Sequence, residues 1–156
     1  MHEPRHVVIG AIDPRTPPIA AMIRELDRYM IELYPAESNH LVDIDALTRP
    51  NVRFFAAAAD QEYLGCGAIM IHGADYAEIK RVFVSPAARG LGLGKRILET
   101  LEGAARKEGL SLLRLETGIS QPEALHLFAA FGFSRCGAFG DYPHGDPYSV
   151  FMEKRL

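Results

Sequence analysis

The sequence predicts an α/β fold of the α+β kind, with about seven strands and about four helices in a single domain that spans residues 1–156. Three observations support this prediction. Runs rich in β-branched and aromatic residues alternate with segments whose apolar residues recur at helical spacing. A turn with three glycines joins one such strand to one such helix near mid-chain. The length of 156 residues and the 48% hydrophobic content suit one core.

The first half of the chain is predicted to contain three strands and two helices. An apolar stripe that starts at Pro17 or Pro18 indicates a long helix. Ser38 or Asn39 can cap a shorter helix, which Pro50 ends. In chain order, the expected elements are a strand at 7–12, helices at 17–34 and 38–50, and strands at 52–59 and 63–71.

The middle of the chain combines a strand, a glycine-rich turn and a helix. The strand at 78–84 meets Pro86, which cannot donate to a β-ladder. Glycines let a ligand approach the backbone closely, and the unpaired N–H groups at a helix start attract anions. The turn residues are Gly90, Gly92 and Gly94, with Arg89 and Lys95 adding positive charge. This stretch therefore predicts a phosphate-binding site.

Two familiar phosphate loops do not fit the spacing of these glycines. A dinucleotide fingerprint would need glycine where Lys95 stands. A nucleotide P-loop would need glycine at Arg89 and Ser or Thr at Arg96. The pattern that does fit is R-x-x-G-x-G, formed by Arg89, Gly92 and Gly94.

The second half of the chain is predicted to contain three more strands and a helix. Thr117-Gly118 is expected to break the first of these strands. Ser120-Gln121-Pro122-Glu123 has the form of a capping box for the helix, which Gly132 closes. The expected strands are 110–116, 133–139 and 149–154.

Composition favours some classes of protein over others. The net charge is −3, with 17 basic and 20 acidic residues mixed along the chain, so we expect no nucleic-acid partner. With no apolar stretch long enough for a bilayer and no cleavage site near the start, we expect no membrane association and a cytoplasmic location. The two cysteines predict reduced thiols, and the six scattered histidines predict no metal site.

Two motifs resemble a known family. R-x-x-G-x-G after Val82-Phe83-Val84 resembles the acetyl-coenzyme A loop of the GCN5-related N-acetyltransferases (GNAT), and the predicted element order matches their fold. The segment 121–133 resembles the family's N-x-x-A-x-x-L-Y-x-x-x-G-F, except that Gln121 replaces Asn and Phe128 replaces Tyr. The wider set LYPAESNH, RLETG, QPEAL and DPYSVFMEK is similar to a subgroup of small bacterial acetyltransferases.

The resemblance implies a mixed, mostly antiparallel central sheet and acetyl-coenzyme A as cosubstrate, without a metal. Its arm would enter between two strands that splay apart, and an N–H near the bend would polarise the thioester carbonyl. The implied cofactor-binding residues are Val82, Phe83, Val84, Arg89, Gly90, Leu91, Gly92, Leu93, Gly94, Lys95, Gln121 and Phe128.

Direct attack by an amine needs a base, a polarised carbonyl and a proton for the departing thiolate. Family bases often lie on the strand of Glu78, which alternation places on the same face as Lys80 and Val82; the alternative is that Glu78 pairs with Lys80 or Arg81. Glu116 is a second carboxylate, at a position where members of the family often place acceptor or water contacts. The alternative is that Glu116 is the partner of an N-terminal helix. Because Phe128 lacks a hydroxyl, Tyr142 is our candidate acid.

The acceptor is expected to be a small-molecule or peptide amine. The residues predicted to line its site are Tyr34, Glu37, His40, Tyr142 and His144, for which capping and loop packing are the alternative roles. Dimers are common in the family, so a homodimer is one expected assembly. A catalytically impaired acyl-coenzyme A-binding regulatory module is the alternative function, motivated by Phe128.

Overall fold

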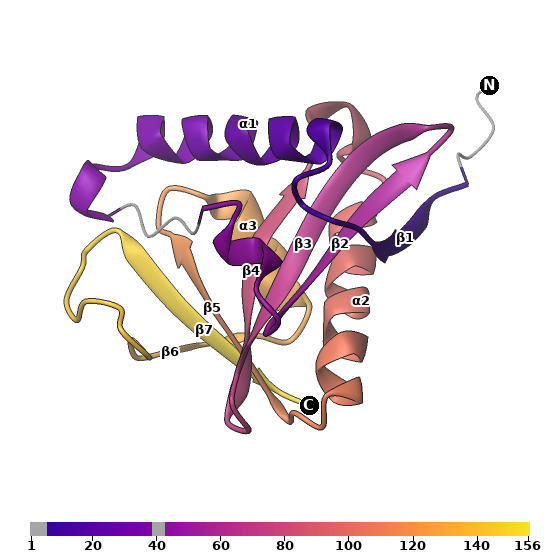
Figure 1. The fold of residues 1–156 in the computed structure, drawn as a ribbon. Coiled ribbons are helices and arrows are strands. Elements are labelled where there is room, and N and C mark those ends of the chain that lie inside the picture. Colours follow the sequence, from indigo (N-terminus) through magenta and orange to yellow (C-terminus); the bar gives the residue numbers. More distant parts are fainter. Residues whose placement is uncertain (1–5, 39–42) are drawn as a thin grey trace.

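The computed structural model describes residues 6–38 and 43–156, and its seven strands form one sheet in the order β1-β2-β3-β4-β5-β7-β6 (Figure 1). Neighbouring strands are antiparallel except β4 and β5, which confirms the expected mixed, mostly antiparallel sheet. The elements are β1 (Val8–Ala11), α1 (Pro17–Leu33), η1 (Ala36–Ser38), η2 (Ala46–Thr48), β2 (Val52–Ala59), β3 (Glu62–His72), β4 (Tyr76–Val84), η3 (Pro86–Ala88), α2 (Leu93–Lys107), β5 (Leu112–Gly118), α3 (Pro122–Ala130), β6 (Ser134–Cys136) and β7 (Ser149–Arg155).

Helices cover both faces of the sheet. On one face, α1 buries Ile19 and Ile23 against a cluster that includes Phe54 of β2. On the other, α2 buries Ile97 in the core cluster that contains Ala57 of the same strand. Figure 1 shows α1 lying across one end of the sheet while α2 runs along its side. Because neighbouring residues of a strand point to opposite faces, β2 serves both layers.

The helix predicted at 38–50 is wrong for the described part of that stretch, where η1 and η2 are short 3₁₀ turns. The Asp43 carboxylate accepts the Ala46 N–H at 2.8 Å, and such local side-chain bonds compete with a continuous helix. The described residues therefore contain three α-helices instead of about four. None of these helices has the length and apolar character that crossing a bilayer requires.

Three boundaries in the second half differ from the predictions. Thr117 and Gly118 continue β5, because they pair with Val150 and Ser149 of β7. The strand expected at 133–139 is reduced to β6. Ser120 does not form a capping box, since Gln121 is the N-cap residue of α3 and makes no side-chain cap bond.

A β-bulge changes the facing of β4. The pairing of β3 with β4 shifts between Cys66 and Ala68, and Arg81 has a φ of 57°, which side chains rarely adopt. As a result Val82 packs into the same cluster as Ile79, on the α2 face. The predicted sharing of one face by Glu78 and Val82 is therefore wrong, because strict alternation ignores the extra residue.

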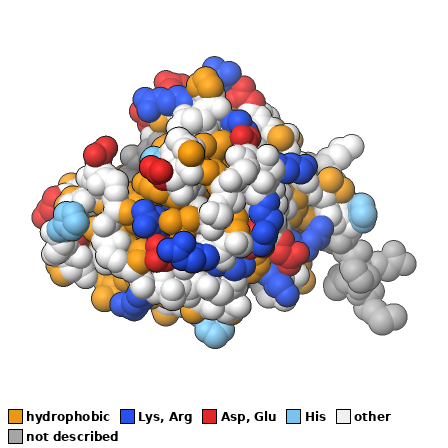
Figure 2. Space-filling view, turned by 90° about the horizontal axis from the view of Figure 1, so that it is seen from below, with side chains coloured by type: hydrophobic (Ala, Val, Ile, Leu, Met, Phe, Trp, Pro, Cys, Tyr) orange, Lys and Arg blue, Asp and Glu red, His pale blue; other side chains and the backbone are white. Residues whose placement is uncertain are grey.

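The surface mixes both signs of charge. On the face drawn in Figure 2, Lys and Arg side chains lie beside Asp and Glu side chains, with hydrophobic side chains between them. This agrees with the 17 basic and 20 acidic residues distributed along the chain.

Candidate active site

The pocket of interest opens where the two parallel strands separate. The strands β4 and β5 pair at Ala77–Leu113, Glu78–Arg114 and Ile79–Leu115, and the ladder between them ends at the last of these pairs. Beyond this point the wall of the pocket is shared by α1, β4, β5 and α3. Its polar lining residues are Lys80, Arg81, Glu116, Thr117 and Gln121, and Leu26, Met30 and Phe128 are among the apolar ones. The expected divergence of the two strands is confirmed.

The glycine-rich turn leads directly into α2. Gly90 and Gly92 have positive φ angles of 83° and 72°, and Gly92 is the N-cap residue of the helix. The Arg96 N–H donates to the Gly92 carbonyl at 3.3 Å, so the amides of residues 93–95 precede the first helical bond. Amides at this position, with the exposed Arg89 side chain nearby in the chain, suit a phosphate.

The glycines of this turn have different roles. A Cβ on Gly92 would meet no atom within 4 Å, so glycine is needed at this position because of the positive φ and not because of limited space. A Cβ on Gly94 would lie 2.9 Å from Cδ2 of Leu127, so this glycine allows α2 to pack closely against α3. Leu91 and Lys95 are exposed, whereas the Leu93 side chain is buried, which leaves its main chain for a ligand.

The end of β4 presents one edge to β3. Phe83 pairs with Cys66 and Val84 with Gly65. The Phe83 side chain packs in the α1 layer, while Val84 packs in the α2 layer. The opposite edge of this segment lies beyond the last β4–β5 pair, where an extended ligand could add to the strand.

Glu78 lies in a cluster of polar side chains, and only 4% of its own side chain is exposed. Its Oε1 lies 3.0 Å from His72 Nε2, and its Oε2 lies 2.9 Å from Lys80 Nζ. Tyr142 donates its hydroxyl to the same Oε2. Glu78 therefore pairs with Lys80, which was the alternative to a role as base. Of these two residues, Lys80 is among those that line the described pocket and Glu78 is not.

Tyr142 fixes this cluster from the loop that precedes β7. Its hydroxyl accepts from the Lys80 ammonium, which lies 5.1 Å from the ring centre. Burial, then the charge of Glu78, raises the pKa of Tyr142 far above its ordinary value. The hydroxyl therefore stays protonated and serves as a donor to Glu78.

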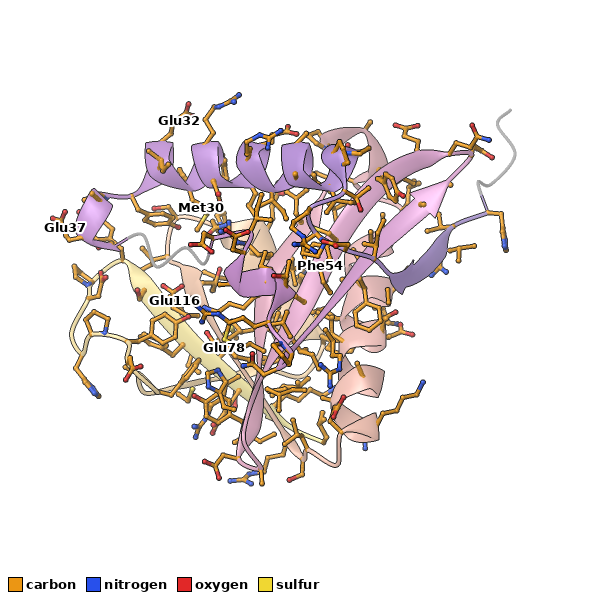
Figure 3. The ribbon with its side chains drawn as sticks, viewed as in Figure 1. Met30, Glu32, Glu37, Phe54, Glu78 and Glu116 are labelled. Atoms are coloured by element: carbon orange, nitrogen blue, oxygen red, sulfur yellow. The ribbon has the colours of Figure 1, made fainter. Side chains whose placement is uncertain are left out.

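Glu116 occupies the neighbouring strand and lines the pocket itself. Its Oε2 accepts the hydroxyl of Ser149 on β7 at 2.8 Å. Both glutamates lie in the layer below α1 (Figure 3). The bond to Ser149 ties this carboxylate to β7, and Leu26 and Met30 of α1 line the same pocket.

Tyr34 joins α1 to the start of α3. Its hydroxyl accepts the Ser120 N–H at 3.1 Å and donates to Gln121 Oε1 at 3.3 Å. The same Oε1 accepts the Gly118 N–H, and a Cβ on Gly118 would lie 1.7 Å from the tyrosine hydroxyl. Burial raises the pKa of Tyr34. These contacts leave the Gln121 amide nitrogen for a ligand in the pocket.

The segments that carry Glu37 and His144 are joined by a hydrogen bond from the Ser38 hydroxyl to Asp146 at 3.0 Å, but neither Glu37 nor His144 lines the described pocket. Glu37 lies in η1 with its side chain exposed, and Figure 3 shows it at the outer end of that turn. His144 is exposed in the loop before β7. His40 lies outside the described residues.

The sequence analysis gives Lys80 and Arg81 only as possible partners of Glu78 and does not name His72. Alternation placed Lys80 beside Glu78 and could have identified it. The buried Arg81 forms an ion pair with Asp27 of α1, and burial lowers its pKa to about 10. The contact of His72 with Glu78 depends on the β3–β4 register, which carries no motif.

A helix start whose first amides precede the helical bonds follows β4, and a carboxylate lies in the gap beside β5; this arrangement suits an enzyme that uses an acyl-coenzyme A. The chain belongs to the acetyltransferase (GNAT) family, whose model matches residues 19–133. It is 47% identical over 152 residues to the IAA acetyltransferase of Azospirillum brasilense, covering 97% of this chain and 99% of that one. It is 34% identical to the N-acetyltransferase YsnE of Bacillus subtilis, which is uncharacterized, over 97% and 99% of the two chains.

Solved structures agree with this assignment. A Klebsiella pneumoniae protein assigned as an acyl-CoA N-acyltransferase superposes with a TM-score of 0.83 at 36% identity, over 96% of this chain and 97% of that chain. Membership of the family makes this chain an acetyl-coenzyme A-dependent N-acetyltransferase. The alternative of a regulatory module without catalysis is not favoured. Among the described residues, no three His, Cys, Asp or Glu side chains gather as metal ligands.

Proposed function

We propose that acetyl-coenzyme A lies along the free edge of β4 and that a small primary amine attacks its thioester in the gap beside β5. The observation that carries this proposal is the pocket between these strands, which is lined by Glu116 and Lys80. The amides at the start of α2, with Arg89 and Lys95, would hold the pyrophosphate. Backbone groups of residues 82–84 and the Gln121 amide would hold the arm.

The wall contributed by α1 limits the acceptor. Leu26 and Met30 line the pocket with apolar surface, whereas Glu116 supplies a negative charge. A primary amine with an apolar body matches both features, because the carboxylate attracts its ammonium form. We therefore propose a small-molecule amine as acceptor, in preference to a peptide terminus.

The two carboxylates take different parts in the proposed reaction. Glu116 lies on the pocket wall, so it is placed to accept the proton of the attacking amine. Glu78 is the base that the family resemblance implies, but its oxygens contact His72, Lys80 and Tyr142. Its influence on the pocket, and that of Tyr142, passes through Lys80.

Turnover tests the proposal. Wild-type protein would be mixed with acetyl-coenzyme A and a panel of small apolar amines, amino acids and short peptides, and thiol release would be followed with a thiol reagent. The expected result is repeated turnover that is fastest with small apolar amines. Equal or faster turnover with peptides would contradict the acceptor class, and failure of every amine would contradict the proposed reaction.

A further inference from the structure

The departing thiolate needs a proton donor, and the pocket wall offers few. Phe128 has no hydroxyl, and the Thr117 hydroxyl and Gln121 amide are not acids at neutral pH. The Arg81 guanidinium forms an ion pair with Asp27. Among the polar residues that line the described pocket, the ammonium of Lys80 is the donor that can both lose and regain a proton.

The surroundings of Lys80 suit such a donor. Its side chain is 13% exposed, and Nζ contacts Oε2 of Glu78 and the hydroxyl of Tyr142. An ammonium carries three N–H bonds, so these two partners leave one for a group in the pocket. Transfer of this proton to a thiolate would neutralise both charges, which is favourable where water is excluded.

A chain of ionisable groups leads from Lys80 to the solvent. Glu78 contacts Lys80 through Oε2 and His72 through Oε1, at 2.9 and 3.0 Å. The exposed fraction of the side chain rises from 4% at Glu78 to 35% at His72. Protons can therefore move between bulk water and Lys80 through hydrogen-bonded groups.

We propose that Lys80 protonates the coenzyme A thiolate and that His72 and Glu78 return a proton to Lys80 from solvent. This inference rests on the proposed function. As the C–S bond of the tetrahedral adduct breaks, its electron pair stays on sulfur, an S–H bond forms and Lys80 becomes a neutral amine. His72 then gives a proton to Oε1 of the Glu78 carboxylate, and the carboxyl group rotates to deliver that proton to Lys80.

Protons balance over one cycle. An amine that binds as its ammonium form loses two protons through Glu116 to water, one to become the nucleophile and one after attack, while His72 takes one from water; one proton is released per turnover. The charged and titratable groups around Lys80 come from three strands, one helix and one loop. They are Tyr76, Glu78 and Arg81 of β4, His72 of β3, Arg114 and Glu116 of β5, Asp27 of α1 and Tyr142 of the loop before β7.

Two variants of Lys80 test the acid role. Lys80→Arg keeps the charge but holds its proton too tightly, whereas Lys80→Met removes both. With an amine that the wild type accepts, we expect kcat to fall at least about tenfold in both variants. Acetyl-coenzyme A affinity by calorimetry should stay within about twofold of wild type. Lys107→Arg, an exposed position on α2, is the matched control.

The pH profile separates an acid from a structural lysine. The pH profile of kcat at alkaline pH should differ between the wild type and Lys80→Arg, because arginine does not give up its proton. If Lys80→Arg kept the kcat of the wild type, or the same dependence of kcat on alkaline pH, the proposal would be overturned while acetyl transfer itself would stand. No thiol release by the wild type would instead overturn the proposed function and this inference with it.

The relay is tested at His72. His72→Gln keeps a hydrogen bond to Glu78 but cannot carry a proton, so kcat should fall in a non-nitrogenous buffer and recover when imidazole is added. His126→Gln, at an exposed position of α3, is the control, and its kcat should equal that of the wild type with and without imidazole. A His72→Gln enzyme with wild-type kcat and no response to imidazole would overturn the relay.

Discussion

The two ends of the candidate active site are built from different parts of the chain. The cofactor end is one continuous stretch of main chain, in which Gly92 adopts a φ of 72° at the start of α2. The acceptor end is made of side chains from α1, β4 and β5, such as Met30, Lys80 and Glu116. A local turn is enough to bind a phosphate, whereas the chemistry depends on groups that only the tertiary fold brings together.

The largest effect should come from the acceptor end. Glu116→Gln removes the proposed proton acceptor while keeping an oxygen for the Ser149 hydroxyl, so kcat should fall about a hundredfold or more with little change in acetyl-coenzyme A affinity. Steady-state thiol release and calorimetry measure the two quantities. Glu99→Gln, an exposed position of α2, is the control. A normal kcat in Glu116→Gln would remove this residue from the reaction.

The next effect concerns the stability of the acceptor end. Asp27→Ala leaves the guanidinium of Arg81, whose side chain is 4% exposed, without its carboxylate, and we expect the free energy of unfolding to fall by about 2 to 3 kcal/mol. Urea denaturation checks this. Asp13→Ala, which breaks the exposed pair with Arg15, should show no comparable loss. Equal effects in the two variants would show that burial does not distinguish them.

Substitutions at the cofactor end should mainly weaken the binding of acetyl-coenzyme A. Gly92→Val forces a β-branched residue into positive φ and displaces the first amides of α2, so acetyl-coenzyme A affinity should fall about tenfold, or about 1.4 kcal/mol. Gly103→Val makes the same change in the same helix, where an added Cβ also meets open space. Calorimetric titration of both variants decides the matter, and equal affinities would contradict the assignment of this turn.

The smallest effect is expected where the two ends meet. Tyr34→Phe removes the acceptor of the Ser120 N–H and a donor to Gln121, which should lower the free energy of unfolding by about 1 kcal/mol. Tyr29→Phe, at an exposed position of the same helix, should have no effect on urea denaturation. A neutral Tyr34→Phe would show that water replaces the lost bonds.

The sequence predicted the sheet and the glycine turn well because both leave local signals. Gly92 has an effect through its own φ, and strands such as β2 show their residues in one run. The contacts of the acceptor end carry no such signal, since Asp27 and Arg81 meet only after folding. The bulge at Arg81 also interrupts the alternation of side chains along β4, so Val82 lies on the opposite face of the sheet from the one predicted.

The helix predicted before Pro50 failed for a related reason. Its apolar spacing was compatible with a helix, but local bonds such as that from Ala46 N–H to Asp43 favour short turns. Gln121, predicted to bind the cofactor arm through its amide, lines the pocket, and its oxygen is engaged by Gly118 and Tyr34. Such details depend on neighbours that are distant in sequence.

A crystal structure of the protein with acetyl-coenzyme A would test the central claim most directly. We predict that the pyrophosphate contacts the amides of residues 93–95 and that the thioester sulfur lies between β4 and β5, within reach of Lys80. Electron density for the cofactor on another face of the sheet, or a sulfur directed away from this gap, would contradict the account.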